Sequence, residues 1–130
     1  MNWLKAAGLS VLALIAPVRA VMLTVGCLII ADFLLGMWAA RRRGEAITSA
    51  AMRRTVSKML VYQMVVLTGY LTEVHLLGSL LPVSKLVGGI IGVVELKSVL
   101  ENASTILGQD LFRALIKKLG SANDRREDGQ

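Results

Sequence analysis

Residues 18–40 read VRAVMLTVGCLIIADFLLGMWAA, an apolar run that is followed directly by Arg41-Arg42-Arg43. A helix rises about 1.5 Å per residue, so a run of this length crosses the hydrocarbon core of a bilayer. Asp32 interrupts the run with charge, and Trp38 lies near its basic end, as expected of an aromatic side chain at headgroup depth. The stretch therefore predicts a transmembrane helix.

Two further apolar runs follow in the chain. Residues 59–81 read MLVYQMVVLTGYLTEVHLLGSLL and stop at Pro82, which cannot continue a helical hydrogen-bond ladder. Residues 83–107, VSKLVGGIIGVVELKSVLENASTIL, form the most polar run. We therefore predict an all-α membrane protein with three transmembrane helices. Residues 3–16, WLKAAGLSVLALIA, are short for a crossing, so they predict an interfacial helix, the alternative being a fourth span.

The basic residues predict the orientation. The segment 41–58 carries six basic side chains against Glu45 alone, so the positive-inside rule places this loop in the cytoplasm, together with the C-terminus. Anionic headgroups attract such a segment by about 1 kcal/mol per basic side chain near the surface. The basic residues expected at the membrane surface are Arg41, Arg42, Arg43, Arg53, Arg54 and Lys58.

The chain divides into three parts. Residues 1–17 form an N-terminal amphipathic or short membrane helix, and residues 18–107 form the transmembrane domain with the basic cytoplasmic loop 41–58. Residues 108–130 predict a cytoplasmic amphipathic helix and a polar tail that starts after Gly120. Asp110 is available to cap the start of that last helix.

Composition excludes several functional classes. The chain has 130 residues, of which 55% are hydrophobic, and a formal net charge of +6. One Cys and one His cannot complete a disulfide or a zinc site, and no Gly-rich phosphate loop follows a strand. With two Phe, two Tyr and two Trp, the chain has few rings on which bases could stack. We therefore predict no enzymatic activity, no cofactor, no metal and no nucleic-acid partner.

Charged residues inside the apolar runs are the most informative feature, because each costs about 2.5–3.5 kcal/mol at the bilayer centre. Lys97 and Glu101 are four residues apart and predict an ion pair on one helix face. Glu95 is expected to face another helix or another subunit. Asp32 and Glu73 have no basic neighbour in their own runs, and are candidates to meet Lys97, to take up a proton or to line water.

Small residues recur at four-residue spacing at Ser84, Gly88 and Gly92, a pattern that lets two helices approach closely in lipid. Packing within one chain and contact between copies are both compatible with this pattern. The residues considered as candidates for oligomer contacts or pore lining are Asp32, Gly36, Glu73, Ser84, Gly88, Gly92, Glu95, Lys97, Glu101 and Asn102.

Three stretches together resemble a known family. They are Asp32-Phe33-Leu34-Leu35-Gly36 with the small residues that follow Trp38, the loop 49–58 that leads to a lysine, and the segment 94–103 with its pattern Glu-x-x-Ser-x-x-Glu-Asn. In this order they are similar to small phage holins of the phage-lysis and toxin-secretion type, over about residues 25–120. The chain departs from that pattern in Lys97 and in its more strongly charged loop, which has Ala50-Ala51 in place of a glycine.

The resemblance implies a homo-oligomer in the bacterial inner membrane that forms lesions at host lysis, through which an endolysin or a toxin leaves. It also implies an antiholin as a partner, and an endolysin that depends on the holin without contacting it. The alternatives are a small non-lytic channel or transport subunit, an antiholin, and a scaffold that recruits a cytoplasmic partner through residues 41–58.

Overall fold

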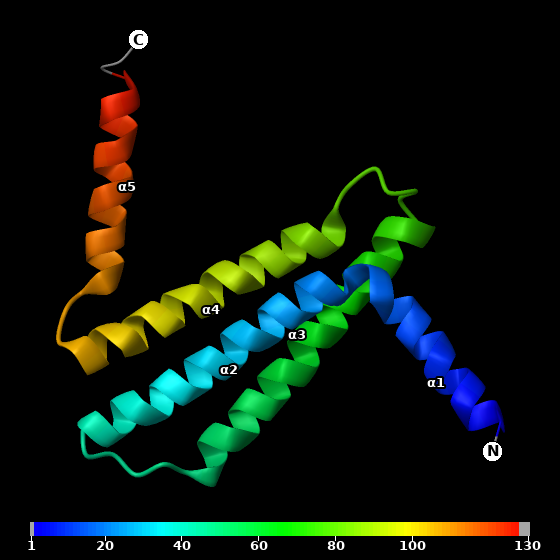
Figure 1. Cartoon of the computed structure of the whole chain (residues 1–130), viewed down its shortest axis with the longest axis horizontal. Helices are drawn as coiled ribbons and strands as arrows, with labels where there is room; N and C mark the ends of the chain where they lie inside the picture. The colour runs from blue at the N-terminus through cyan, green and yellow to red at the C-terminus, as the bar shows by residue number, and fades with distance from the viewer. Residues whose placement is uncertain (1, 128–130) are drawn as a thin grey trace.

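The computed structural model describes residues 2–127, and this part of the chain is helical with short connections and no strand (Figure 1). The predicted all-α class is confirmed. Helices α2, α3 and α4 lie side by side as a bundle, whereas α1 and α5 point away from its two ends (Figure 1). The elements are α1 (Asn2–Ile15), the short 3-10 helix η1 (Ala16–Val18), α2 (Arg19–Arg42), α3 (Ser49–His75), α4 (Val83–Leu107) and α5 (Leu111–Glu127).

Local sequence signals explain several helix ends. The side chain of Thr48 accepts a hydrogen bond from the Ala51 N–H at the start of α3. Gly108 ends α4 in the left-handed conformation, with φ of 67°, which glycine adopts without steric cost. Asp110 caps α5 as predicted, because its Oδ1 accepts the Arg113 N–H at 2.9 Å.

Two predicted boundaries differ from the structure. Helix α3 already begins at Ser49, so most of the basic loop 41–58 is helical and residues 43–48 connect α2 to α3. Helix α3 ends at His75 rather than at residue 81, because Gly78 and Ser79 adopt positive φ values of 54° and 60° and turn the chain.

The C-terminal helix is longer than the sequence predicts. Helix α5 extends to Glu127 and so includes most of the segment expected to form a polar tail. The rest of that predicted tail, residues 128–130, lies outside the described residues.

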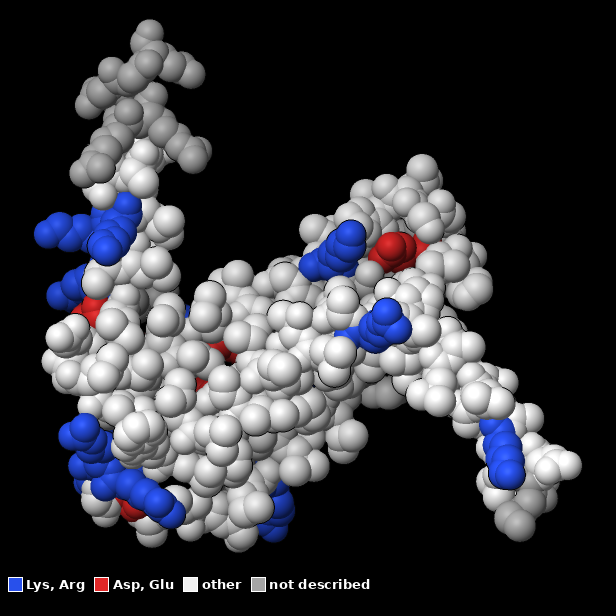
Figure 2. Space-filling view, viewed as in Figure 1, with Lys and Arg blue, Asp and Glu red and all other residues white. Residues whose placement is uncertain are grey.

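The bundle has a small apolar interior and a broad apolar exterior. Val25, Ile29 and Val66 form the centre of the buried core, while large apolar side chains such as Leu23 and Leu60 are exposed on the outside. Figure 2 shows this largely uncharged surface, with Lys and Arg gathered mainly toward the ends of the helices. An exterior of this kind is expected where lipid rather than water surrounds the helices.

Length and composition identify one membrane-spanning candidate among the described residues, the continuous helical stretch Asn2–Arg42. Helices α3 and α4 combine apolar length with more charge, so three transmembrane helices remain a prediction. Between α1 and α2, Pro17 lies in η1, where the chain turns, and this separates the N-terminal helix from the bundle (Figure 1).

Candidate functional site

One lysine connects all three helices of the bundle. Lys58 Nζ of α3 donates to Asp32 Oδ2 of α2 at 3.1 Å and to Glu95 Oε2 of α4 at 2.8 Å. The side chain of Glu95 is 1% exposed, that of Asp32 15% and that of Lys58 25%. A single ammonium group therefore bridges two carboxylates in the interior of the bundle.

The second oxygen of Asp32 is held by α4. Asp32 Oδ1 accepts hydrogen bonds from Ser98 Oγ at 2.6 Å and from Asn102 Nδ2 at 2.9 Å. Gly36, one turn after Asp32, leaves room for this amide, because a Cβ there would stand 3.4 Å from Asn102 Nδ2. We call Asp32, Lys58, Glu95, Ser98 and Asn102 the polar cluster.

The position of the polar cluster along α2 indicates how deep the cluster would lie in a membrane. Asp32 lies six residues before Trp38, or about 9 Å along the helix axis. If Trp38 stands at headgroup depth, Asp32 is well inside the hydrocarbon layer. With both carboxylates ionised, the cluster has a formal charge of −1, which is costly in that environment unless water reaches it.

A cavity provides such a route toward one end of the bundle. It has a volume of about 440 Å³ and extends from Asp32, Lys58 and Asn102 to Arg43 and Arg54 beside the connection between α2 and α3. Because polar side chains line both of its ends, water can enter it. The part of the cluster formed by Asp32, Lys58, Ser98 and Asn102 thus opens toward the basic loop.

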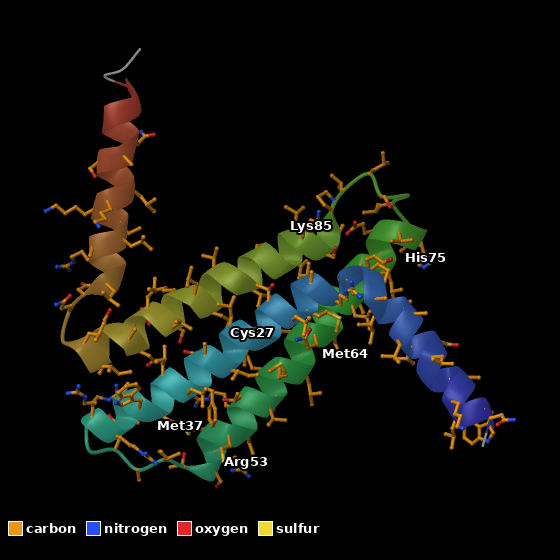
Figure 3. All side chains as sticks on the ribbon, in the orientation of Figure 1. Cys27, Met37, Arg53, Met64, His75 and Lys85 are labelled. Carbon is orange, nitrogen blue, oxygen red and sulfur yellow. The ribbon has the colours of Figure 1, made fainter. Side chains whose placement is uncertain are left out.

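A second polar contact joins the end of α3 to the start of α4, near the labelled His75 and Lys85 in Figure 3. Glu73 Oε2 accepts both the backbone N–H of Ser84, at 3.0 Å, and its hydroxyl, at 2.7 Å. The residue before α4, Pro82, provides no side-chain cap. Glu73 therefore caps α4 from another helix, and it does not meet Lys97.

Gly88 and Gly92 of α4 face α2. A Cβ on Gly88 would overlap the Cγ1 of Val21, and a Cβ on Gly92 would stand 3.7 Å from Leu28 Cδ1. In the structure the row of Ser84, Gly88 and Gly92 thus provides close approach within one chain, and contact between copies stays a prediction.

Lys97 and Glu101 form the predicted pair, with Lys97 Nζ 3.6 Å from Glu101 Oε1, and their side chains are 57% and 60% exposed. They lie outside the polar cluster, so the cation that Asp32 meets is Lys58 and not Lys97. The sequence placed Lys58 on the basic surface. The structure corrects this, because α3 begins at Ser49 and directs Lys58 toward α2 and α4.

The remaining basic residues of this region are exposed, as expected for the membrane surface: Arg41, Arg42, Arg43, Arg53 and Arg54. Arg43 donates to both carboxylate oxygens of Glu45, at 2.8 and 3.0 Å. These hydrogen bonds hold the pKa of Glu45 below its ordinary value.

Two polar residues of the interior were not among the sequence candidates: Ser98, which appeared only within the family pattern of residues 94–103, and Gln63. Gln63 Nε2 donates to the carbonyl oxygen of Met22 at 2.9 Å, while its Oε1 is buried without a partner. The signal for Ser98 was its spacing, because Glu95, Ser98 and Asn102 share one face of α4. Gln63 could have been noticed as an uncharged polar residue within an apolar run.

Comparison with families of known proteins gives a match over most of the chain. A family model described as the bacteriophage holin family matches residues 10–123. The chain belongs to this family. The holin is thus a membrane protein, and its family is not an enzyme family. Neither the curated proteins nor the solved structures give a match.

Among the residues that the structure describes, no group of His, Cys, Asp and Glu could hold a metal ion. The polar cluster combines charged and hydrogen-bonding groups from three helices, so it couples the positions of these helices to one another.

Proposed function

We propose that this holin accumulates in the bacterial inner membrane as a multi-pass protein with a cytoplasmic C-terminus. There it assembles in many copies and opens lesions through which an endolysin or a toxin leaves the cell. Membership of the holin family supports the proposal. The observation that carries it is the bridge from Lys58 to Asp32 and Glu95, in which Glu95 is buried and the other two charges are partly buried, between helices whose outer faces are apolar.

The bridge gives the chain two ways to satisfy its polar groups in a membrane. In the closed bundle, Lys58 and the two carboxylates satisfy one another within one chain. If the helices part, the same groups need water, which an assembly of several copies around an aqueous lesion provides. The apolar outer faces then remain against lipid or against other copies.

The other residues predicted for assembly have supporting roles in this proposal. The contacts of Gly36, Ser84, Gly88 and Gly92 keep α2, α3 and α4 close in the closed bundle. Parting the bundle frees these narrow faces for contact between copies. The exposed pair of Lys97 and Glu101 is the exception, because it lies outside these contacts and has no assigned role in the proposal.

Expression in a bacterium tests the function directly. The chain is induced while culture density and membrane potential are followed, and its presence in the membrane fraction is measured. A lag followed by an abrupt loss of potential and density supports a holin. Steady growth with abundant protein in the membrane supports the non-lytic channel subunit or the antiholin, and co-expression with a lytic holin separates these two, because an antiholin delays the partner's lysis.

A matched pair of variants tests the polar cluster within this function. Lys58→Met removes the bridging cation, whereas Lys97→Met removes an exposed cation from the same bundle. We expect Lys58→Met to change the lysis time severalfold and Lys97→Met to leave it nearly unchanged. Equal lysis times for the two variants, at equal membrane levels, would show that the cluster has no part in lesion formation.

A further inference from the structure

A groove lies at the end of α2 that leads into the basic connection. It has a volume of about 480 Å³ and is lined by Leu34, Met37, Trp38, Arg41, Arg42 and Ile47. Figure 3 labels Met37 in this part of the molecule, and Figure 2 shows the basic patch beside it. The groove is thus apolar along the helix and basic at the helix end.

The three consecutive arginines at this end are not equivalent. Arg43 is engaged by both oxygens of Glu45. By contrast, no side chain that the structure describes pairs with Arg41 or Arg42, although both are exposed and line the groove. Two guanidinium groups therefore stand at the mouth of an apolar groove without a counter-ion from their own chain.

The apolar residues that line the groove match the membrane depth expected for these arginines. Leu34 and Trp38 lie on α2 below Arg41 and Arg42, and Ile47 comes from the connection on the other side. All three side chains are exposed. A ring such as that of Trp38 is favoured at the boundary between headgroups and acyl chains, so the wall belongs at acyl-chain depth and the arginines at phosphate depth.

We propose that this groove is a binding site for one anionic phospholipid of the cytoplasmic leaflet. Arg41 and Arg42 bind its phosphodiester, since guanidinium groups donate paired hydrogen bonds to phosphate oxygens. One acyl chain lies along Leu34, Trp38 and Ile47. The apolar wall selects a lipid over free phosphate. The inference rests on the proposed embedding of α2 in the membrane, but not on lesion formation.

Trp38 provides the probe for this site. The chain has two tryptophans, Trp3 and Trp38, so Trp3→Phe leaves Trp38 as the single fluorescent indole. The full-length variant is reconstituted in phosphatidylcholine vesicles that contain a minor fraction of phosphatidylglycerol. Acyl chains brominated on either the phosphatidylglycerol or the phosphatidylcholine quench the indole that they contact.

We expect brominated phosphatidylglycerol to quench Trp38 well beyond its share of the lipid. The two arginines should give a preference on the order of tenfold. Arg41→Gln/Arg42→Gln should reduce that preference to about the level set by lipid composition, while Arg41→Lys/Arg42→Lys keeps part of it. The matched control is Arg53→Gln/Arg54→Gln, which removes the same charge from α3 outside the groove and should retain the preference.

Three results would overturn the lipid site. One is quenching in proportion to lipid composition in the parent variant. Another is an equal loss of preference in the control, because the effect would then come from overall surface charge. The third is displacement of the brominated lipid by inorganic phosphate, which would identify a free-phosphate site. Failure of the proposed embedding is distinguishable, because neither brominated lipid would then quench Trp38.

Discussion

Lys58→Met should destabilise the bundle more than any other single charge removal among its ion pairs. The variant leaves Asp32 and Glu95 without their shared cation, although the side chain of Glu95 is 1% exposed. With both carboxylates ionised, the formal charge of the cluster changes from −1 to −2. Glu95→Gln changes it to zero and keeps the 3.1 Å pair of Lys58 with Asp32.

The expected magnitudes follow from burial. Removing one partner of a buried ion pair costs about 3–5 kcal/mol, because the remaining charge stays desolvated. Lys58 is partly exposed, so we expect the lower part of that range. Glu95→Gln replaces a charged acceptor by a neutral amide and should cost about 1–2 kcal/mol. Lys97→Met affects a pair that is more than half exposed on both sides and should cost less than about 1 kcal/mol.

Reversible unfolding in mixed detergent micelles measures these differences. The purified full-length chain is titrated with a denaturing detergent, helicity is followed by circular dichroism, and the free energies of unfolding are compared. A double-mutant cycle with Lys58→Met and Glu95→Gln isolates their coupling, which we expect to exceed about 1 kcal/mol. Lys58→Arg, which keeps the cation, should recover much of the loss.

Two outcomes would refute this reasoning. One is equal stability of Lys58→Met and Lys97→Met, which would mean that the bridge at Lys58 contributes no more than the exposed pair. The other is a larger loss of unfolding free energy for Glu95→Gln than for Lys58→Met, which would mean that the excess carboxylate stabilises the bundle.

Two further predictions concern helix contacts. Gly88→Ala should destabilise the bundle by about 1–3 kcal/mol, because the new Cβ overlaps the Cγ1 of Val21; Gly89→Ala, with nothing within 4 Å of its Cβ, should not lower the free energy of unfolding in the same micelle titration. Glu73→Gln should weaken the cap on α4 by about 1–2 kcal/mol, because one carboxylate oxygen accepts both donors of Ser84. Hydrogen exchange of the first amides of α4 should then accelerate, and unchanged rates would contradict the cap.

The helices themselves were predictable from the sequence. Apolar runs of helical length gave α2 and α4 almost to the residue, because basic residues and Gly108 mark their ends. The end of α3 was harder to predict. Nothing in the composition of the run 59–81 shows that Gly78 and Ser79 take positive φ values, because Ser adopts that conformation only when the surrounding chain requires it.

The polar cluster was predictable in part. Asp32 and Glu95 were identified as costly in lipid, Asn102 was a candidate for oligomer contacts or pore lining, and the pair of Lys97 and Glu101 followed from helical spacing. The partner of Asp32 was not identified, because Lys58 precedes the apolar run and was counted with the surface bases. Its role depends on where α3 begins and on the angle between helices, and neither is encoded in spacing along a single run.

If α2, α3 and α4 all span the membrane, as proposed, the polar cluster also constrains how the chain enters it. Asp32, Lys58 and Glu95 come from different helices, so each helix inserted alone would carry an uncompensated charge into lipid. The short connection 43–48 lets α2 and α3 enter as a hairpin in which Asp32 already meets Lys58. Helix α4 finds a counter-ion for Glu95 only by docking on that hairpin. Under the proposed embedding we therefore expect the hairpin, whose Asp32–Lys58 pair is neutral, to enter first and α4 to dock last.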